Sequence, residues 1–170
     1  MSFLRKESPY PHWEFLHTHN SDCLRIVPER GGLITGWRCN GREILYLDQN
    51  RFEDHSKSVR GGIPILFPIC GNLFDQKFIF QDALYPLKQH GFARDSIWDI
   101  KLLKDKIIQL SLSENDNSMN YFPFKFNLKM EIRLSSNLLE LNLILVNNSH
   151  MKMPYSLGLH PYFLVDNIQK

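Results

Sequence analysis

Apolar and polar side chains alternate strictly in one long segment of the chain, residues 126–134 (Phe-Asn-Leu-Lys-Met-Glu-Ile-Arg-Leu). Successive side chains of a strand point to opposite faces of its sheet, so this pattern predicts an antiparallel strand with one buried face and one wet face. Polar turns at 104–105 and 135–137 separate this segment from similar ones. The further strands expected in this half of the chain are residues 98–102, 108–112 and 139–143.

The first half of the chain contains a second hairpin signal. Residues 33–39 and 43–47 are rich in strand-forming side chains and flank Asn40-Gly41, the dipeptide that most favours a type I′ turn. Residues 24–27 predict another strand, with Gly31-Gly32 as its turn. No segment combines a helical period with caps, and no repeat is visible. The sequence therefore predicts an all-β fold, an antiparallel β-sandwich built from consecutive hairpins.

Residues 60–72 interrupt this pattern. They are apolar, yet Pro64 and Pro68 would each remove a ladder hydrogen bond from a central strand. We expect a buried, extended loop instead. Gly61 and Gly62 permit a close backbone approach, either to a ligand or to a second segment of the chain, and the sequence favours neither explanation.

A polar loop is expected at residues 88–95, where His90, Gly91 and Arg94 lie within a few positions of each other. Histidine and arginine side chains can both donate hydrogen bonds to the oxygens of a polyhydroxylated or anionic ligand. The alternative is a surface loop that carries an Arg94–Asp95 ion pair.

His160 stands between Leu159 and Pro161 at the end of an apolar, strand-like segment. The proline disfavours the helical backbone for the residue before it, so we expect the imidazole at a strand end in an apolar, aromatic setting. A restrained histidine with a pKa near neutrality suits a general acid or base. The alternative is a buried structural histidine that bonds a backbone carbonyl.

Composition narrows the classes of function. The net charge is only +2 and the basic residues are scattered, which argues against a nucleic-acid partner. The three cysteines, 23, 39 and 70, are widely spaced, which favours reduced thiols in a cytoplasmic protein. The N-terminus lacks the pattern of a signal peptide, and no apolar run could cross a membrane. Histidines 12, 17 and 19 share no regular element, so a solvated or edge-strand segment is favoured over a metal site.

Three motifs in order resemble the aldose 1-epimerase (mutarotase) family, most nearly its hexose-6-phosphate branch: Arg60-Gly-Gly-Ile-Pro64 with Phe67-Pro68, His90-Gly-Phe-Ala-Arg94, and Leu159-His-Pro-Tyr-Phe163. The similarity runs from about Gly31 to Phe163. The resemblance implies a galactose mutarotase-like β-sandwich with a sugar in a cleft, and acid–base interconversion of the α and β anomers without cofactor or metal. His160 would then be the catalytic acid at the ring oxygen. His90 would bind and polarise the sugar, and Arg60 and Arg94 would hold the substrate or its phosphate.

The chain departs from the family in two places. Residues 69–72 are Ile-Cys-Gly-Asn where an aromatic pair and glycine are typical of the phosphate branch, which leaves a free aldose as a possible substrate. The family's general base is a glutamate well beyond the histidine motif, and neither Glu131 nor Glu140, both on the wet face of their strands, matches it. We therefore expect residues 1–170 to be one domain, an N-terminal part of a mutarotase whose sandwich lacks its C-terminal strands.

From this we expect little mutarotase activity from the chain alone and a monomer for a full-length protein. The partner expected is a small-molecule sugar or sugar phosphate. The alternative function is a carbohydrate- or sugar-phosphate-binding module without catalysis, which would keep Arg60, His90 and Arg94 and need no base.

Overall fold

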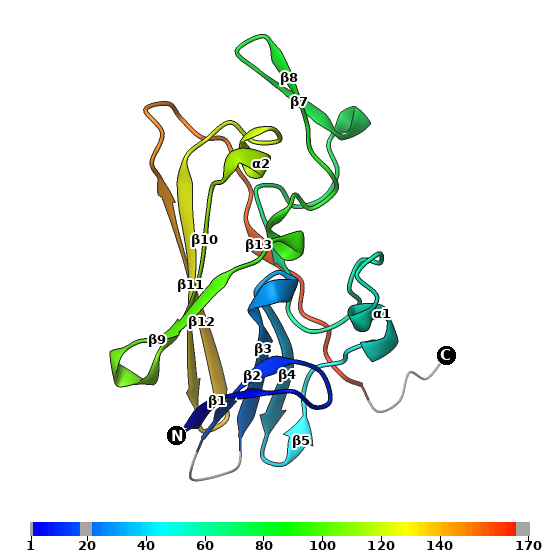
Figure 1. Cartoon of the computed structure of the whole chain (residues 1–170), viewed down its shortest axis with the longest axis vertical. Helices are drawn as coiled ribbons and strands as arrows, with labels where there is room; N and C mark the ends of the chain where they lie inside the picture. Colours follow the sequence, from blue (N-terminus) through cyan, green and yellow to red (C-terminus); the bar gives the residue numbers. More distant parts are fainter. Residues whose placement is uncertain (1, 18–21, 166–170) are drawn as a thin grey trace.

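Two antiparallel sheets make up the body of the molecule (Figure 1). The computed structural model describes residues 2–17 and 22–165. The first sheet has the order β1-β2-β3-β4-β5, with bounds Ser2–Lys6, His12–Leu16, Cys23–Val27, Leu33–Cys39 and Arg42–Glu43. The second has the order β12-β11-β10-β9, with bounds Leu138–Asn147, Phe126–Ser135, Ile108–Ser113 and Asp99–Leu102.

The alternation in residues 126–134 does bury one face of the sheet. In β11 the side chains of Phe126, Leu128, Met130, Ile132 and Leu134 are buried, and those between them are half-buried or exposed. One core cluster joins them to the inward faces of β2, β3 and β4. The two sheets therefore share a single core, and the predicted all-β antiparallel sandwich is confirmed.

The predicted turns at the N-terminal sheet are also observed. Asn40 and Gly41 have φ values of 50° and 76°, as a type I′ turn requires. The strand expected at 43–47 is wrong, however, because β5 ends at Glu43. Beyond it the backbone leaves the sheet, and Leu45 and Leu47 make isolated bridges to Phe163 and Gly61.

Of residues 60–72, which were expected to be a buried, extended loop, 61–68 are buried, whereas Arg60, Cys70 and Asn72 are exposed. Only Ile65–Leu66 (β6) is a strand, and it pairs with Gly158–Leu159 (β13). A Cβ on Gly61 would lie 2.5 Å from Cα of Leu47, and one on Gly62 would lie 2.3 Å from the carbonyl oxygen of Ile34. The two glycines thus allow this segment to pack closely against the backbone at Leu47 and Ile34.

Short elements that the sequence analysis did not predict complete the fold. Residues 75–87, where the sequence indicates a loop with short extended pieces, contain a hairpin of β7 (Lys77–Phe80) and β8 (Ala83–Pro86) that projects from one end of the molecule (Figure 1). Helices were not expected, yet α1 (Gln49–Glu53) and α2 (Asp116–Met119) are present. They are one-turn helices held by their caps, too short to show a helical period. Single 3₁₀ turns lie at Pro28–Arg30, Phe74–Gln76, Ala93–Asp95 and Lys104–Lys106.

The N-terminal segment contributes two strands. β1 is an edge strand, as expected, but β2 lies inside the sheet between β1 and β3. His12 on β2 is buried, and its Nδ1 is 2.7 Å from the carbonyl oxygen of Tyr10. His19 lies outside the described residues. Within residues 2–17 and 22–165, no group of three or more His, Cys, Asp or Glu side chains could hold a metal ion.

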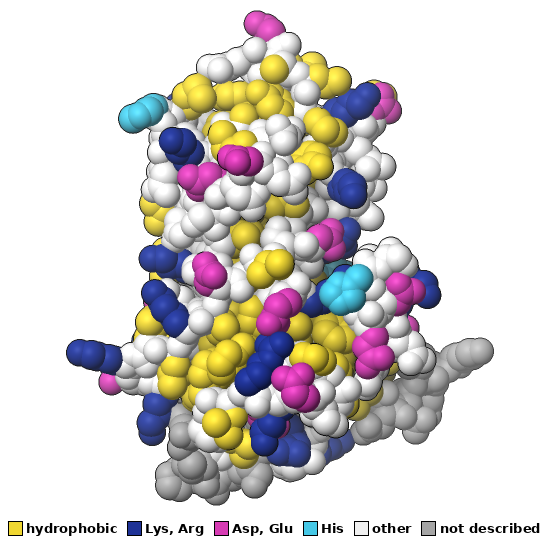
Figure 2. Space-filling model, in the orientation of Figure 1, with side chains coloured by type: hydrophobic (Ala, Val, Ile, Leu, Met, Phe, Trp, Pro, Cys, Tyr) yellow, Lys and Arg dark blue, Asp and Glu magenta, His cyan; other side chains and the backbone are white. Residues whose placement is uncertain are grey.

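The surface carries charges of both signs without a large block of either on the face shown in Figure 2. No helix in the described part of the chain has the length and apolar character needed to cross a membrane.

Candidate active site

The structure brings all four predicted site residues to one cleft. Arg60, His90, Arg94 and His160 line a solvent-open space of about 490 Å³. They come from three segments that are far apart in the sequence and are joined by the buried segment 61–68. The other lining residues are Arg30, Gly31, Leu33, Val59, Pro64, Leu66, Asp95 and Tyr162.

His160 directly follows β13, so the prediction of a strand-end histidine is confirmed. Its peptide N–H donates to the carbonyl oxygen of Pro64 at 3.0 Å, which continues the pairing of β13 with β6. The ring is stacked on Tyr162, with centroids 4.8 Å apart and an interplanar angle of 29°. The side chain is exposed, however, so the apolar enclosure expected for it is wrong among the described residues, and so is a buried structural role. Among the described residues, the His160 ring is stacked on Tyr162 and meets the His90 ring edge-on.

His90 is held by the backbone around it. It adopts a left-handed conformation, with φ 66°, and Gly91 follows with φ 69°. A Cβ on Gly91 would lie 2.2 Å from the carbonyl oxygen of Phe67, which accepts from the peptide N–H of Phe92 at 3.0 Å. This close approach requires glycine at position 91. It carries the half-buried His90 ring to within 6.5 Å of the His160 ring, centroid to centroid.

The electrostatics of the cleft are set by its cations. Burial lowers the pKa of His90, and the nearby charges of Arg94, His160 and Arg60 lower it further. Arg94 donates through Nη2 to the carbonyl oxygen of Gln89 at 2.9 Å, and its Nε is 3.9 Å from a carboxylate oxygen of Asp95. The expected Arg94–Asp95 ion pair is thus present, but Arg94 lines the cleft as well. Asp95 is the single carboxylate among the described residues that line it.

Arg30 is a cleft residue that sequence reasoning missed. Its Nη2 donates to the carbonyl oxygens of Asp54 and Lys57, at 3.0 and 2.8 Å. The next residue, Gly31, donates to the carbonyl oxygen of Ser96 at 2.9 Å. Arg30 thus joins the turn after α1 to the loop that contains Arg94. The Gly31-Gly32 turn was the only signal in the sequence for a close contact here.

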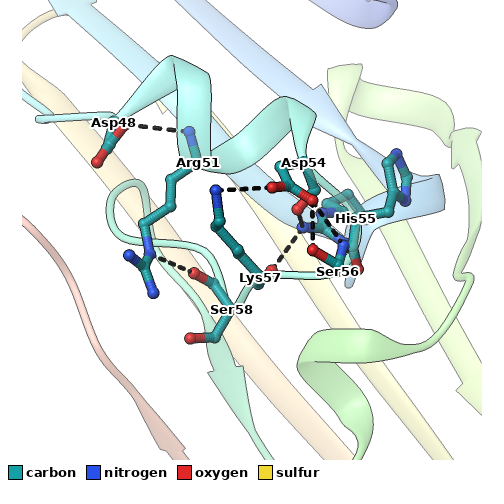
Figure 3. A network of polar contacts seen from close by, with 8 residues as sticks. Asp48, Arg51, Asp54, His55, Ser56, Lys57 and Ser58 are labelled. Atoms are coloured by element: carbon teal, nitrogen blue, oxygen red, sulfur yellow. Dashed lines mark hydrogen bonds and ion pairs between the residues drawn. The ribbon is translucent and has the colours of Figure 1, made fainter.

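The turn after α1 is braced by its own polar network (Figure 3). Asp54 accepts from the hydroxyl of Ser56 at 2.6 Å and pairs with Lys57 at 2.8 Å. Hydrogen bonds from Lys57 and Ser56 lower the pKa of the Asp54 carboxyl. Arg51 donates through Nε to the carbonyl oxygen of Ser58 at 3.1 Å. This network shapes the backbone that leads into Val59 and Arg60, one wall of the cleft.

Solved structures of other proteins resemble this fold. A protein from Synechocystis sp. PCC 6803, Slr1438, has a structure that matches with a TM-score of 0.85 and 42% identity, over 96% of this chain and 57% of that one. The galactose mutarotase related enzyme from Lactobacillus acidophilus matches with a TM-score of 0.78 and 26% identity, over 91% and 50%. The fold is therefore of the galactose mutarotase-like type.

Relatives matched by sequence support the same assignment. The proteins named "Putative glucose-6-phosphate 1-epimerase" from Cenchrus ciliaris and Escherichia coli (strain K12) are 28% and 26% identical over 162 and 146 residues. These alignments cover 88% and 83% of this chain but 46% and 45% of the relatives. The chain thus spans about half the length of the curated relatives it matches. The family model described as aldose 1-epimerase matches residues 15–170. The chain belongs to the aldose 1-epimerase family.

Proposed function

We propose that this chain carries the sugar-binding and acid part of a mutarotase that interconverts the anomers of an aldose or a hexose 6-phosphate. The observation that carries the proposal is the juxtaposition of His90 and His160 in one cleft with Arg60 and Arg94. Family membership supplies the reaction type, and the geometry supplies donors for a polyhydroxylated ligand. No step requires a cofactor.

In the proposed reaction His160 is the general acid. Its ring is exposed in the cleft and restrained by the bond from its own N–H to Pro64 and by the stack on Tyr162. It gives a proton to the ring oxygen while a base takes the proton of the anomeric hydroxyl, and the bond between C1 and the ring oxygen breaks. Rotation about C1–C2 and closure on the other face, with the proton transfers reversed, gives the other anomer.

The base is the part of this reaction for which the described cleft offers no good candidate. Asp95 is the only carboxylate that lines it, and the Arg94 guanidinium lies beside that carboxylate. One acid–base group is typically worth about 10²–10⁴ in rate, so we expect slow turnover from this chain alone.

The positive cleft supports a phosphorylated substrate. Arg60 makes no ion pair with a described residue, and Arg94 and Arg30 use only part of their donors on backbone carbonyls. Guanidinium groups bind phosphate oxygens through paired, charge-assisted hydrogen bonds. The two relatives named as glucose-6-phosphate 1-epimerases agree with this choice.

Calorimetric titration with glucose 6-phosphate and with glucose tests the substrate class. We expect Arg94→Ala to weaken glucose 6-phosphate binding by about tenfold or more and to change glucose binding by less than about threefold, because charge-assisted hydrogen bonds are the stronger ones. Arg133→Ala is the matched control, since Arg133 is exposed on β11 outside the cleft. Equal weakening of both ligands by Arg94→Ala would show that the phosphate role is wrong.

The alternative is a sugar-binding module without catalysis. It is favoured because Asp95, the one carboxylate among the described residues that line the cleft, is paired with Arg94. Anomer exchange measured by NMR separates the two. Exchange that exceeds the uncatalysed rate and is lost in His160→Asn indicates an epimerase. Binding with no gain in exchange indicates the module.

A further inference from the structure

A reciprocal pair of hydrogen bonds joins His90 to Gly71. The peptide N–H of His90 donates to the carbonyl oxygen of Gly71 at 2.8 Å. In return, the peptide N–H of Gly71 donates to Nδ1 of the His90 ring at 2.9 Å. Two loops that are 19 positions apart in the sequence are thereby closed on each other through one imidazole.

The second of these bonds decides where the ring proton lies. A peptide N–H can only donate, so Nδ1 must offer a lone pair and carry no hydrogen. In the neutral ring the proton then lies on Nε2, because the hydrogen bond at one ring nitrogen sets the protonation of the other. An imidazolium would place a second N–H at Nδ1, facing the N–H of Gly71, and the bond would be lost.

The surroundings of the ring favour the same neutral form. His90 is half-buried, and Arg94, His160 and Arg60 add positive charge around it. Burial first, and these charges second, lower its pKa. His160 differs, because its side chain is exposed and neither of its ring nitrogens is hydrogen-bonded to a residue in the described ranges.

We propose that the peptide N–H of Gly71 is a positioning group that fixes His90 as the neutral Nε2–H tautomer, so that His90 serves the cleft only as a hydrogen-bond donor. Nε2 has no acceptor among residues 2–17 and 22–165 and is available to a ligand oxygen. The two histidines then have different roles: His90 donates a hydrogen bond to the ligand, and His160 transfers the proton. The claim that the ligand atom is a sugar oxygen depends on the proposed function, whereas the assignment of the tautomer is independent of it.

Long-range ¹H–¹⁵N correlation NMR on the histidine-labelled chain, without sugar, tests the tautomer. We expect His90 to show the pattern of a single Nε2–H tautomer at pH 7. His150, whose side chain is exposed, is the internal reference, and we expect it to show a mixture of both tautomers. An Nδ1–H pattern, an imidazolium or a tautomer mixture at His90 would overturn the proposal.

Two substitutions test the donor role in binding. In His90→Asn the side-chain oxygen takes the place of Nδ1 and can still accept from Gly71, but no donor remains at the position of Nε2. Asparagine also tolerates the left-handed backbone found here, so the loop should keep its shape. In His90→Gln the amide nitrogen replaces Nε2 as a donor that cannot titrate.

We expect glucose binding to fall by about tenfold in His90→Asn and to be retained within about threefold in His90→Gln, in line with the loss of one hydrogen bond. Wild-type affinity in His90→Asn would contradict the donor role. If the wild-type chain binds no sugar at all, the proposed function fails, and the tautomer is still decided by the NMR pattern.

Discussion

At the scale of single residues, both histidines of the cleft are held by their backbones: the peptide N–H of His160 donates to Pro64, and that of His90 donates to Gly71. Pro161 correctly placed His160 in an extended conformation at a strand end, because the restriction on the residue before proline is local. The exposure of the His160 side chain was not predictable in this way, since it depends on which distant segments cover the ring. The left-handed conformation of His90 had no local signal beyond Gly91.

The lowered pKa of His90 makes a prediction about stability. The unfolded chain binds a proton at His90 near the ordinary pKa of 6.5, whereas the folded chain resists protonation until a lower pH. Between these two values the unfolded state holds more protons, so the free energy of unfolding rises with pH. The contribution of the neutral His90 ring to the free energy of unfolding is fully present above pH 6.5 and is lost as the pH falls through the folded-state pKa of His90.

We expect His90→Asn to remove this part of the pH dependence. Urea denaturation at a series of pH values below and above 6.5 measures it. His150→Asn is the matched control, because His150 is exposed, and its profile should follow the wild type. A His90→Asn profile parallel to the wild type would show that the folded state does not disfavour the charged ring.

At the scale of elements, one aromatic side chain connects the loops of the cleft to the second sheet. Phe67 is fully buried, and its ring contacts Phe92 at 6.2 Å and Phe126 at 5.0 Å, centroid to centroid. Phe92 lies in the loop of His90, and Phe126 begins β11. The position of His90 therefore depends on core packing as well as on hydrogen bonds.

We expect Phe67→Ala to lower the free energy of unfolding by about 3–5 kcal/mol, the usual cost of a cavity left by a buried phenylalanine. Phe74→Ala is the control. Phe74 is 90% exposed, so its loss should change stability by no more than about 0.5 kcal/mol. Urea denaturation measures both variants, and equal effects would show that the aromatic contacts of Phe67 contribute little.

The elements also show why some of the fold could be predicted and some could not. Apolar and polar residues alternate along the six residues of β10 and the ten of β11, and over residues 139–143 of β12, which is long enough to be recognised. Helix α2 has four residues, and its only signal is the capping box of Asn115 and Ser118. The turn of the β7–β8 hairpin uses Gln81 and Asp82 at positive φ, without the glycine that marks such turns.

The candidate site was predictable for a different reason. Its motifs are recognisable as a family pattern, whereas no local rule could show that β6 pairs with β13, more than ninety residues later in the chain. Arg30 was missed because it belongs to none of the three motifs. Long-range contacts place it at the cleft: Gly31 bonds Ser96, and the Arg30 guanidinium bonds the backbone of the turn after α1. Long-range pairing, which creates the cleft, is a property of the whole fold.

At the scale of the whole molecule, β12 is the most exposed long strand. It has ten residues, it is the edge of the second sheet, and within the described ranges it pairs only with β11. Glu140 is its one charged side chain, and Leu138 and Val146 are 49% and 43% exposed. A long, apolar edge strand with free backbone groups is a template for pairing with another chain.

We therefore expect this chain to self-associate in a concentration-dependent way through β12. Val146→Lys places a charge near the end of that edge, which should oppose pairing while changing the free energy of unfolding by no more than about 0.5 kcal/mol. Ile97→Lys is the matched control, because Ile97 is a β-branched side chain that is 73% exposed and precedes β9 on the opposite edge of the sheet. Light scattering coupled to gel filtration over a dilution series measures the mass. If both variants reduce association equally, general surface charge is responsible, and β12 is not the contact.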